Sequence, residues 1–228
     1  MATSTNPLKD ARVSQNILSL LDHLHAASIE QESRLDRTAF EPDQIHNATR
    51  EAFIALDQDK CHFVYQLAHA INAKNIVEAG TSFGVSTIYL GLAVSANVEA
   101  SGGPGTVIGT EHEPSKAEQA CKYWTEAGEV VSRYIDLRVG DLGETLKQNV
   151  PTVDMLLLDI SAPMTLPALK AIQPHLRHGA VVIIDNTIRS AARYKDLLEY
   201  LRQENSGFTN LTIHYSKGLE MCVYAPRS

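Results

Sequence analysis

The chain has 228 residues, which is the size of one domain or of one domain with a modest extension. Apolar residues make up 44% and charged residues 21%, so the composition excludes a disordered tail and a fibrous repeat. The 27 acidic residues outnumber the 20 basic ones, and the resulting net charge of −7 disfavours nucleic acid as a partner.

The cysteines and the hydropathy of the sequence indicate the cellular compartment of the protein. Cys61, Cys121 and Cys222 are far apart and form no CxxC pair, which favours a reducing compartment over a disulfide scaffold or a thiolate metal site. The N-terminus has no apolar signal-like stretch, and the longest apolar runs are far below the ~18 residues of a membrane span. We therefore expect a cytoplasmic protein without a membrane partner.

The first ~70 residues are predicted to be helical, because apolar residues recur at helical spacing. Ile17, Leu21 and Leu24 form one stripe, and Phe63, Leu67 and Ile71 form another. A polar stretch over 30–44, with a proline at 42, separates the two. We assign residues 1–55 to an N-terminal helical segment and residues 56–228 to the main domain.

From residue 75 onward, β-rich runs alternate with helical patterns. The predicted strands cover 75–79, 106–110, 135–139, 153–158 and 180–184, and helices are expected from about 85, over 115–127, near 142–148, over 166–176 and near 191–203. The last runs, 211–215 and 221–224, are separated by too few residues for a crossover helix, so they form an antiparallel pair.

This alternation predicts an α/β fold with a doubly wound, Rossmann-like sheet that is mostly parallel and carries an antiparallel C-terminal hairpin. Ligands of such sheets bind at the carboxyl ends of the strands. The first strand ends in a turn whose Gly80 and Gly84 allow a ligand to approach the backbone closely. Ser86 and the amides of the next helix suit a carboxylate or phosphate, although a plain strand-to-helix turn would have the same sequence.

Acidic residues follow each of the other parallel strands. Glu111 is placed to accept both hydroxyls of a ribose, and Asp141, Asp159 and Asp185 follow the next three strands. Each acid alone is compatible with a helix N-cap, but together they concentrate negative charge at one edge and call for a cationic ligand. Asp159, Asp185 and Asn186 are hard oxygen donors that would suit magnesium or manganese.

The ordered set resembles a known family. The run from Val77 to Thr87 is similar to motif I of the class I S-adenosylmethionine-dependent O-methyltransferases of the cation-dependent catechol and caffeoyl-CoA type. The similarity continues through 111–114, 140–141, 154–159, 178–179 and 185–186 and ends in a hairpin at 218–220, so it covers about residues 55–225.

The resemblance implies a methyltransferase that uses S-adenosylmethionine and a divalent cation, Mg or Mn, to methylate a hydroxyl of a small catechol-like aromatic. The implied metal ligands are Asp159, Asp185 and Asn186, and Asp159 is the implied catalytic residue. The implied cofactor-binding residues are Glu78, Gly80, Thr81, Ser82, Gly84, Ser86, Glu111, His112, Gly140, Asp141 and Asp159. The N-terminal segment is expected to cover the site and contribute to a homodimer.

One departure from the family pattern concerns the general base. The family commonly has a lysine three residues after the first metal aspartate, and Ala162 stands there. Three alternatives stay open: the metal alone acidifies the substrate, another residue such as His112 or His214 replaces the base, or the usual chemistry is lost or altered. We name no general base from the sequence.

Two other functions share part of the pattern. A nucleotide-dependent oxidoreductase would have the glycine turn and the acid after the second strand, but Gly80 and Gly84 do not have GxGxxG spacing. A non-catalytic cofactor-binding module would be compatible with Ala162. The methyltransferase hypothesis accounts for more of the pattern, because it also explains the acids after the fourth and fifth strands.

Overall fold

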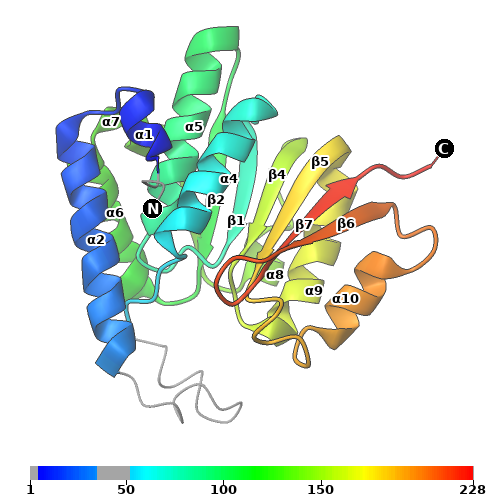
Figure 1. The fold of residues 1–228 in the computed structure, drawn as a ribbon. Helices are drawn as coiled ribbons and strands as arrows, with labels where there is room; N and C mark the ends of the chain where they lie inside the picture. The colour runs from blue at the N-terminus through cyan, green and yellow to red at the C-terminus, as the bar shows by residue number, and fades with distance from the viewer. Residues whose placement is uncertain (1–4, 35–51, 228) are drawn as a thin grey trace.

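A computed structural model of the protein describes residues 5–34 and 52–227. A single seven-stranded sheet lies between two layers of helices (Figure 1). The predicted α/β class is therefore confirmed.

The sheet consists of β1 (Asn75–Ala79), β2 (Thr106–Glu111), β3 (Ile135–Val139), β4 (Val153–Leu158), β5 (Leu176–Asp185), β6 (Phe208–Ile213) and β7 (Leu219–Tyr224). The strand order is β3-β2-β1-β4-β5-β7-β6. The first five strands of this order run parallel, and β7 pairs antiparallel with both β5 and β6. The predicted antiparallel hairpin thus forms the edge of the sheet, with its second strand inserted next to β5.

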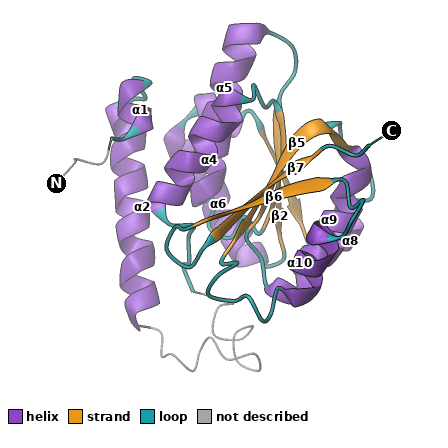
Figure 2. Cartoon of the chain, turned by 45° about the vertical axis from the view of Figure 1, so that its right-hand side comes forward, coloured by secondary structure: helices purple, strands orange, loops and turns teal. Residues whose placement is uncertain are grey.

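Helices cover both faces of the sheet (Figure 2). One layer contains α1 (Pro7–Asp10), α2 (Gln15–Arg34), α4 (Gln58–Ala70), α5 (Val85–Ser101), α6 (Pro114–Ala127) and α7 (Glu129–Ser132). The other contains α8 (Leu142–Thr145), α9 (Ala162–Ile172), the 3₁₀ turn η2 (Gln173–His175) and α10 (Lys195–Arg202). Each layer has its own hydrophobic core against the sheet, so β4 side chains alternate between them: Met155 and Leu157 point to one core, and Leu156 and Leu158 to the other.

The N-terminal helices share the first core. Ile17, Leu21 and Leu24 of α2 are buried in the same cluster as residues of α4 and α5, and α2 packs against α5 and α6. The predicted polar stretch over 30–44 lies partly in α2, which continues to Arg34, and otherwise outside the described residues. The proposed division at 55/56 remains a prediction.

The structure corrects the predicted helix over 166–176. Leu169 and Ile172 lie in α9 as expected, but the helix ends at Ile172, and Leu176 already begins β5. Pro174 lies in the intervening 3₁₀ turn, because proline has no amide hydrogen to continue an α-helix. Strand β5 is therefore longer at its start than the apolar run over 180–184 predicted.

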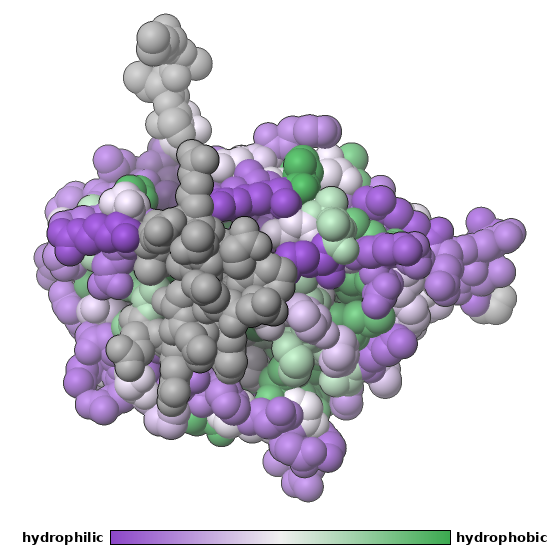
Figure 3. All heavy atoms as spheres, turned by 90° about the horizontal axis from the view of Figure 1, so that it is seen from below, coloured by the Kyte–Doolittle hydropathy of each residue, from purple (hydrophilic) through white to green (hydrophobic). Residues whose placement is uncertain are grey.

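The carboxyl ends of the five parallel strands lie at the lower edge of the sheet in Figure 1. Seen from that side, both polar and apolar side chains are at the surface (Figure 3). Within the described part of the chain, no helix combines the length and hydropathy needed to cross a lipid bilayer.

Candidate active site

The turn between β1 and α5 depends on its glycines. Gly80 and Gly84 have positive φ angles of 97° and 77°, which are costly for residues with a Cβ. A Cβ at Gly80 would overlap the backbone oxygen of Asp159, and a Cβ at Gly84 would lie 2.5 Å from the indole nitrogen of Trp124. The turn is consequently pressed against β4 on one side and α6 on the other.

The buried side chain of Glu78 stabilises this turn through hydrogen bonds. Its carboxylate is fully buried and accepts hydrogen bonds from the hydroxyls of Ser86 (2.6 Å), Thr87 (2.6 Å) and Thr81 (3.0 Å). Burial raises the pKa of Glu78, and the three hydroxyl donors partly oppose the shift. Glu78 thus stabilises the turn through three hydroxyl donors, which come from Thr81 and from the first turn of α5.

Glu111 ends β2 beside the same turn. Its two carboxylate oxygens accept hydrogen bonds from the backbone nitrogens of Ser82 (2.7 Å) and Glu113 (2.8 Å). A carboxylate has about four acceptor positions, so both oxygens keep capacity for two further donors such as vicinal hydroxyls. His112, the next residue, is exposed.

Asp141 follows β3 at the far end of the same edge. It is exposed, and its carboxylate caps α8 by accepting a hydrogen bond from the backbone nitrogen of Glu144 (3.2 Å). The preceding Gly140 has a φ of 125°, and its backbone nitrogen donates to the carbonyl of Glu111 (2.8 Å). Asp141 thus has the N-cap role that its position allowed, and its carboxylate keeps further acceptor capacity.

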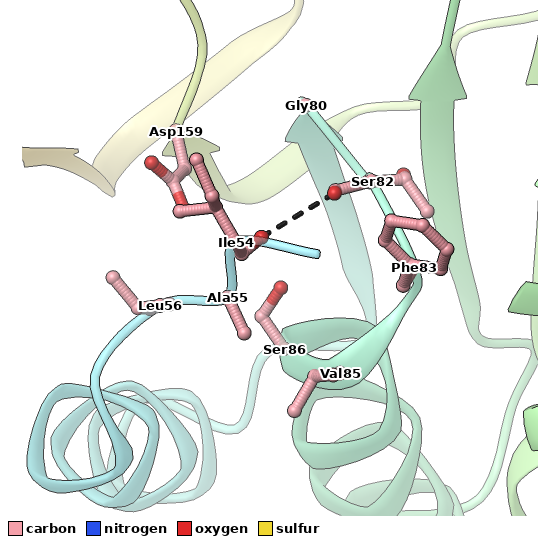
Figure 4. A pocket seen from close by; sticks show the side chains of 10 residues that line it. Ile54, Ala55, Leu56, Gly80, Ser82, Phe83, Val85, Ser86 and Asp159 are labelled. Atoms are coloured by element: carbon pink, nitrogen blue, oxygen red, sulfur yellow. Dashed lines mark hydrogen bonds between the residues drawn. The ribbon is translucent and has the colours of Figure 1, made fainter. Parts of the chain in front are cut away.

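A small cavity lies above the glycine turn (Figure 4). Its volume is about 10 Å³, and Ile54, Ala55 and Leu56 line it across from Ser82 and Phe83. The Ser82 hydroxyl donates to the carbonyl oxygen of Ile54 (3.3 Å). This cavity, as it stands, is too small for a nucleoside-sized ligand.

Asp159 and Asp185 follow β4 and β5 and are close enough to influence each other. Burial and the nearby Asp185 raise the pKa of Asp159 to about 8, against the opposing effect of Lys60. The pKa of Asp185 is also raised by burial, while the Lys60 ammonium and its hydrogen bond lower it. The Asp159 carboxylate lies at the cavity above the turn.

Lys60 of α4 is the cation at this end of the site. Its side chain is 0% exposed, and its Nζ lies 2.6 Å from Oδ1 of Asp185 and 3.0 Å from Oδ2 of Asp57. Burial alone would lower the pKa of Lys60, but the two carboxylates outweigh that effect and raise it. The lysine is accordingly charged and paired.

Asp185, one of the three predicted metal ligands, contacts other side chains with both of its carboxylate oxygens. Asp185 directs Oδ1 at Lys60, and its Oδ2 accepts a hydrogen bond from the side-chain nitrogen of Asn186 (2.8 Å). A divalent cation at Asp185 would have to share this carboxylate with the Lys60 ammonium, which would repel it. Among the residues described here, no group of three His, Cys, Asp or Glu side chains is placed to hold a metal. The side chains at 185 and 186 thus do not fit a divalent cation as they stand.

At the position where the family commonly has a lysine, this chain has Ala162, and its methyl side chain is packed in the protein interior. Ala162 is the first residue of α9, is 8% exposed and belongs to the second hydrophobic core. His112 and His214 are both exposed. Within the described part of the chain, neither histidine makes a side-chain hydrogen bond that would orient it as a base, and no general base is assigned.

Sequence reasoning missed Lys60 and Asp57. The available signal was that Lys60 is four and eight residues before Val64 and Ala68, on the apolar stripe of α4. A lysine on a buried stripe requires a carboxylate partner. Its partner Asp185 is 125 residues away, so the sequence could not name it.

Comparisons with known proteins agree with this architecture. A family model described as "Methyltransferase domain" matches residues 77–187, which include the glycine turn, Glu111, Asp159 and Asp185. Residues 77–187 are therefore similar to a methyltransferase domain. The resemblance inferred from the sequence is therefore confirmed.

Relatives and solved structures extend the comparison. The chain is 30% identical over 141 residues to a catechol O-methyltransferase of Mycobacterium tuberculosis, covering 60% of this chain and 58% of that one. The chain thus spans less than two thirds of the length of this relative. The fold is similar to cofactor-bound Rv0187 from MTB (TM-score 0.70, 22% identity, 99% and 100% of the two chains). It is also similar to an O-methyltransferase from Bacillus cereus in complex with SAH (TM-score 0.66, 21% identity, 90% and 99%).

Proposed function

We propose that this protein is an S-adenosylmethionine-dependent O-methyltransferase that acts on a hydroxyl of a small catechol-like aromatic. The observation that carries the proposal is the order of polar groups along the carboxyl edge of the sheet. In strand order these are Asp141 after β3, Glu111 at the end of β2, the glycine turn after β1, Asp159 after β4 and Asp185 at the end of β5.

This order matches the parts of the proposed ligands. Neighbouring strands are about 4.8 Å apart, so the edge from β3 to β5 spans roughly 19 Å. That length accommodates an adenosine, a methionine and an acceptor ring in a row. We place the adenine amino group near Asp141, the ribose at Glu111, the methionine at the glycine turn and the acceptor between Asp159 and Asp185.

Residues at the carboxyl ends of β1 and β2 are suited to bind S-adenosylmethionine. Helix α5 begins without a side-chain cap, so its first-turn amides are available to the methionine carboxylate. Glu111 offers two acceptor positions to the ribose hydroxyls. The proposed cofactor-binding residues are Gly80, Thr81, Ser82, Gly84, Ser86, Glu111, His112, Gly140, Asp141 and Asp159, with Glu78 holding the turn in shape.

Exposed apolar side chains lie near the carboxyl ends of β4 and β5, where we place the acceptor. Met164 and Ile188 stay 38% and 46% exposed just after the carboxyl ends of β4 and β5. Such side chains suit the face of an aromatic ring, and Asp159 can accept a hydrogen bond from the ring hydroxyl. When bound, S-adenosylmethionine supplies an electrophilic methyl group, so the residues mainly have to align the acceptor oxygen with it and exclude water.

The predicted divalent cation is not part of the proposed function, because the Lys60 ammonium lies 2.6 Å from Oδ1 of Asp185 and would repel it. The homodimer and the cytoplasmic location stay predictions. The relative named catechol O-methyltransferase supports the acceptor class. Ala162 supports a second candidate, a cofactor-binding protein that has lost methyl transfer.

Product analysis tests the proposal. The wild type is incubated with S-adenosylmethionine and a panel of catechols and matched monophenols, and products are identified by mass spectrometry. We expect a monomethylated product from vicinal diols, a strong decrease for Glu111→Gln, and no decrease for the exposed control Glu118→Gln. Calorimetric binding of S-adenosylhomocysteine without any product would favour the second candidate, and absence of both would refute the proposal.

A further inference from the structure

Lys60 is the unexplained group of this site. It comes from α4, outside the matched methyltransferase domain at 77–187, yet its ammonium lies at the end of β5. Its side chain is 0% exposed and Asp185 is 5% exposed. A lysine buried so completely loses its hydration, and the fold tolerates this only because carboxylates replace the water.

The contacts of Lys60 are those expected of a cation at the centre of a site. Its Nζ joins Asp185 Oδ1 at 2.6 Å to Asp57 Oδ2 at 3.0 Å. Asp57 precedes α4 and is joined in turn by the Lys217 ammonium, at 3.8 Å from its Oδ1. Lys60 therefore connects α4, the end of β5 and, through Asp57, the loop of the β6–β7 hairpin.

Lys60 contacts one of the residues that the sequence predicts to hold a metal ion. Asp185 is one of the three predicted metal ligands, and the oxygen it would offer points at Lys60 instead. Its other oxygen is held by Asn186, the third predicted ligand. A second, divalent cation at this carboxylate would be repelled by the ammonium at close range.

We propose that Lys60 is the resident cation of the acceptor site and takes the place of a divalent metal ion at Asp185. Lys60 acts as a positioning residue: it holds Asp185 in place and offsets the negative charge beside which an acceptor oxygen has to lose its proton. This inference rests on the proposed methyl transfer for its role, but the cation replacement itself is testable without an acceptor.

Manganese binding gives the direct test. Chelator-treated wild type is titrated with millimolar Mn²⁺, and free Mn²⁺ is followed by electron paramagnetic resonance. We compare Lys60→Met, which removes the charge at similar length, with Lys122→Met at an exposed position of α6. Wild type and Lys122→Met should leave Mn²⁺ free, whereas Lys60→Met should bind about one Mn²⁺ per chain. A gain of metal binding would not follow from a merely structural role.

Turnover gives a second readout. Wild type should keep its methyl-transfer rate in excess chelator. Lys60→Met should lose roughly tenfold to a hundredfold in kcat and recover part of it on addition of Mg²⁺. If Lys60→Met does not fold, as judged by circular dichroism, Lys60→Arg keeps the charge and should behave as the wild type does.

Two results would overturn the inference: stoichiometric Mn²⁺ binding by the wild type, or a Lys60→Met variant that folds, binds no Mn²⁺ and turns over normally. These results can be told apart from a failure of the proposed function. If no acceptor is methylated, the proposed function fails, but Mn²⁺ binding still decides the role of Lys60. If a catechol is methylated only with added metal, the proposed function stands and the inference about Lys60 fails.

Discussion

The hydroxyl of Thr87 offers the sharpest test of how the glycine turn is held. Thr87 is 0% exposed, and its Oγ1 donates to Oε2 of the buried Glu78 carboxylate at 2.6 Å. Thr87→Val keeps the size and the β-branched shape but removes the donor. The carboxylate then keeps two of its three hydroxyl partners, from Ser86 and Thr81.

The expected cost follows from the charge and burial of the acceptor. A hydrogen bond to a charged group contributes about 1.5–3 kcal/mol, so we expect the free energy of unfolding to fall by about 2 kcal/mol. For a chain of this length, that corresponds to a Tm lower by about 4–8 °C. Loss of the donor should also raise the pKa of Glu78 further, because the hydroxyls oppose the effect of burial.

Urea unfolding monitored by the fluorescence of Trp124 measures this cost, because Trp124 is buried and donates to the carbonyl oxygen of Gly84 in the same turn. The control is Thr125→Val, at an exposed helical position whose hydroxyl donates to the backbone of Cys121. Its effect should stay within about 0.5 kcal/mol. Equal effects of the two substitutions would refute the assigned role of Glu78.

Three further predictions concern neighbouring features. Gly84→Ala should cost about 1–3 kcal/mol more than Gly102→Ala, because both sites have positive φ but only a Cβ at Gly84 meets Trp124. Burial lowers the pKa of His25 to about 4 from 6.5. Below pH 6.5, His25 is therefore protonated in the unfolded state but stays neutral in the folded state. The free energy of unfolding should fall by about 3 kcal/mol as the pH drops to 4. Glu111→Gln should weaken S-adenosylhomocysteine binding about tenfold or more in calorimetry, from the loss of charge-assisted hydrogen bonds to the ribose.

Controls separate these effects from general damage. Gly102→Ala reports the backbone strain alone, since no atom lies within 4 Å of its added Cβ. The urea midpoint of His25→Gln, measured at pH 7 and pH 4.5, should depend less on pH than those of the wild type and of the exposed variant His178→Gln. If His25→Gln keeps the full pH dependence, another group is responsible. If Glu111→Gln binds the cofactor product as tightly as Glu118→Gln, Glu111 does not hold the ribose.

Much of the fold was predictable because its signals are local. The strands at 75–79, 135–139 and 153–158 are apolar or β-branched runs bounded by turns, and the structure has them at those residues. The predicted helix over 166–176 is too long, because the apolar spacing continues to Leu176 although the α-helix ends before Pro174.

The candidate site was predictable only in part. Topology alone brings Glu111, Asp159 and Asp185 to one edge, since parallel strands end together. Some contacts of these carboxylates come from residues far away in the chain, such as Lys60 for Asp185 and Ser82 for Glu111. Lys60 reaches Asp185 from another element, and the Glu78 carboxylate accepts hydrogen bonds from the hydroxyls of Thr81 and Ser86. Neither arrangement follows from spacing.

A crystal structure of the complex with S-adenosylhomocysteine tests the central claim most directly. We predict that the ribose hydroxyls lie within hydrogen-bond distance of the Glu111 carboxylate and that the homocysteine carboxylate lies at the first turn of α5. The sulfur should face Asp159, and the segment at 54–56 should be displaced from the turn. A complex with the ligand at any other edge of the sheet, or with its ribose away from Glu111, would contradict it.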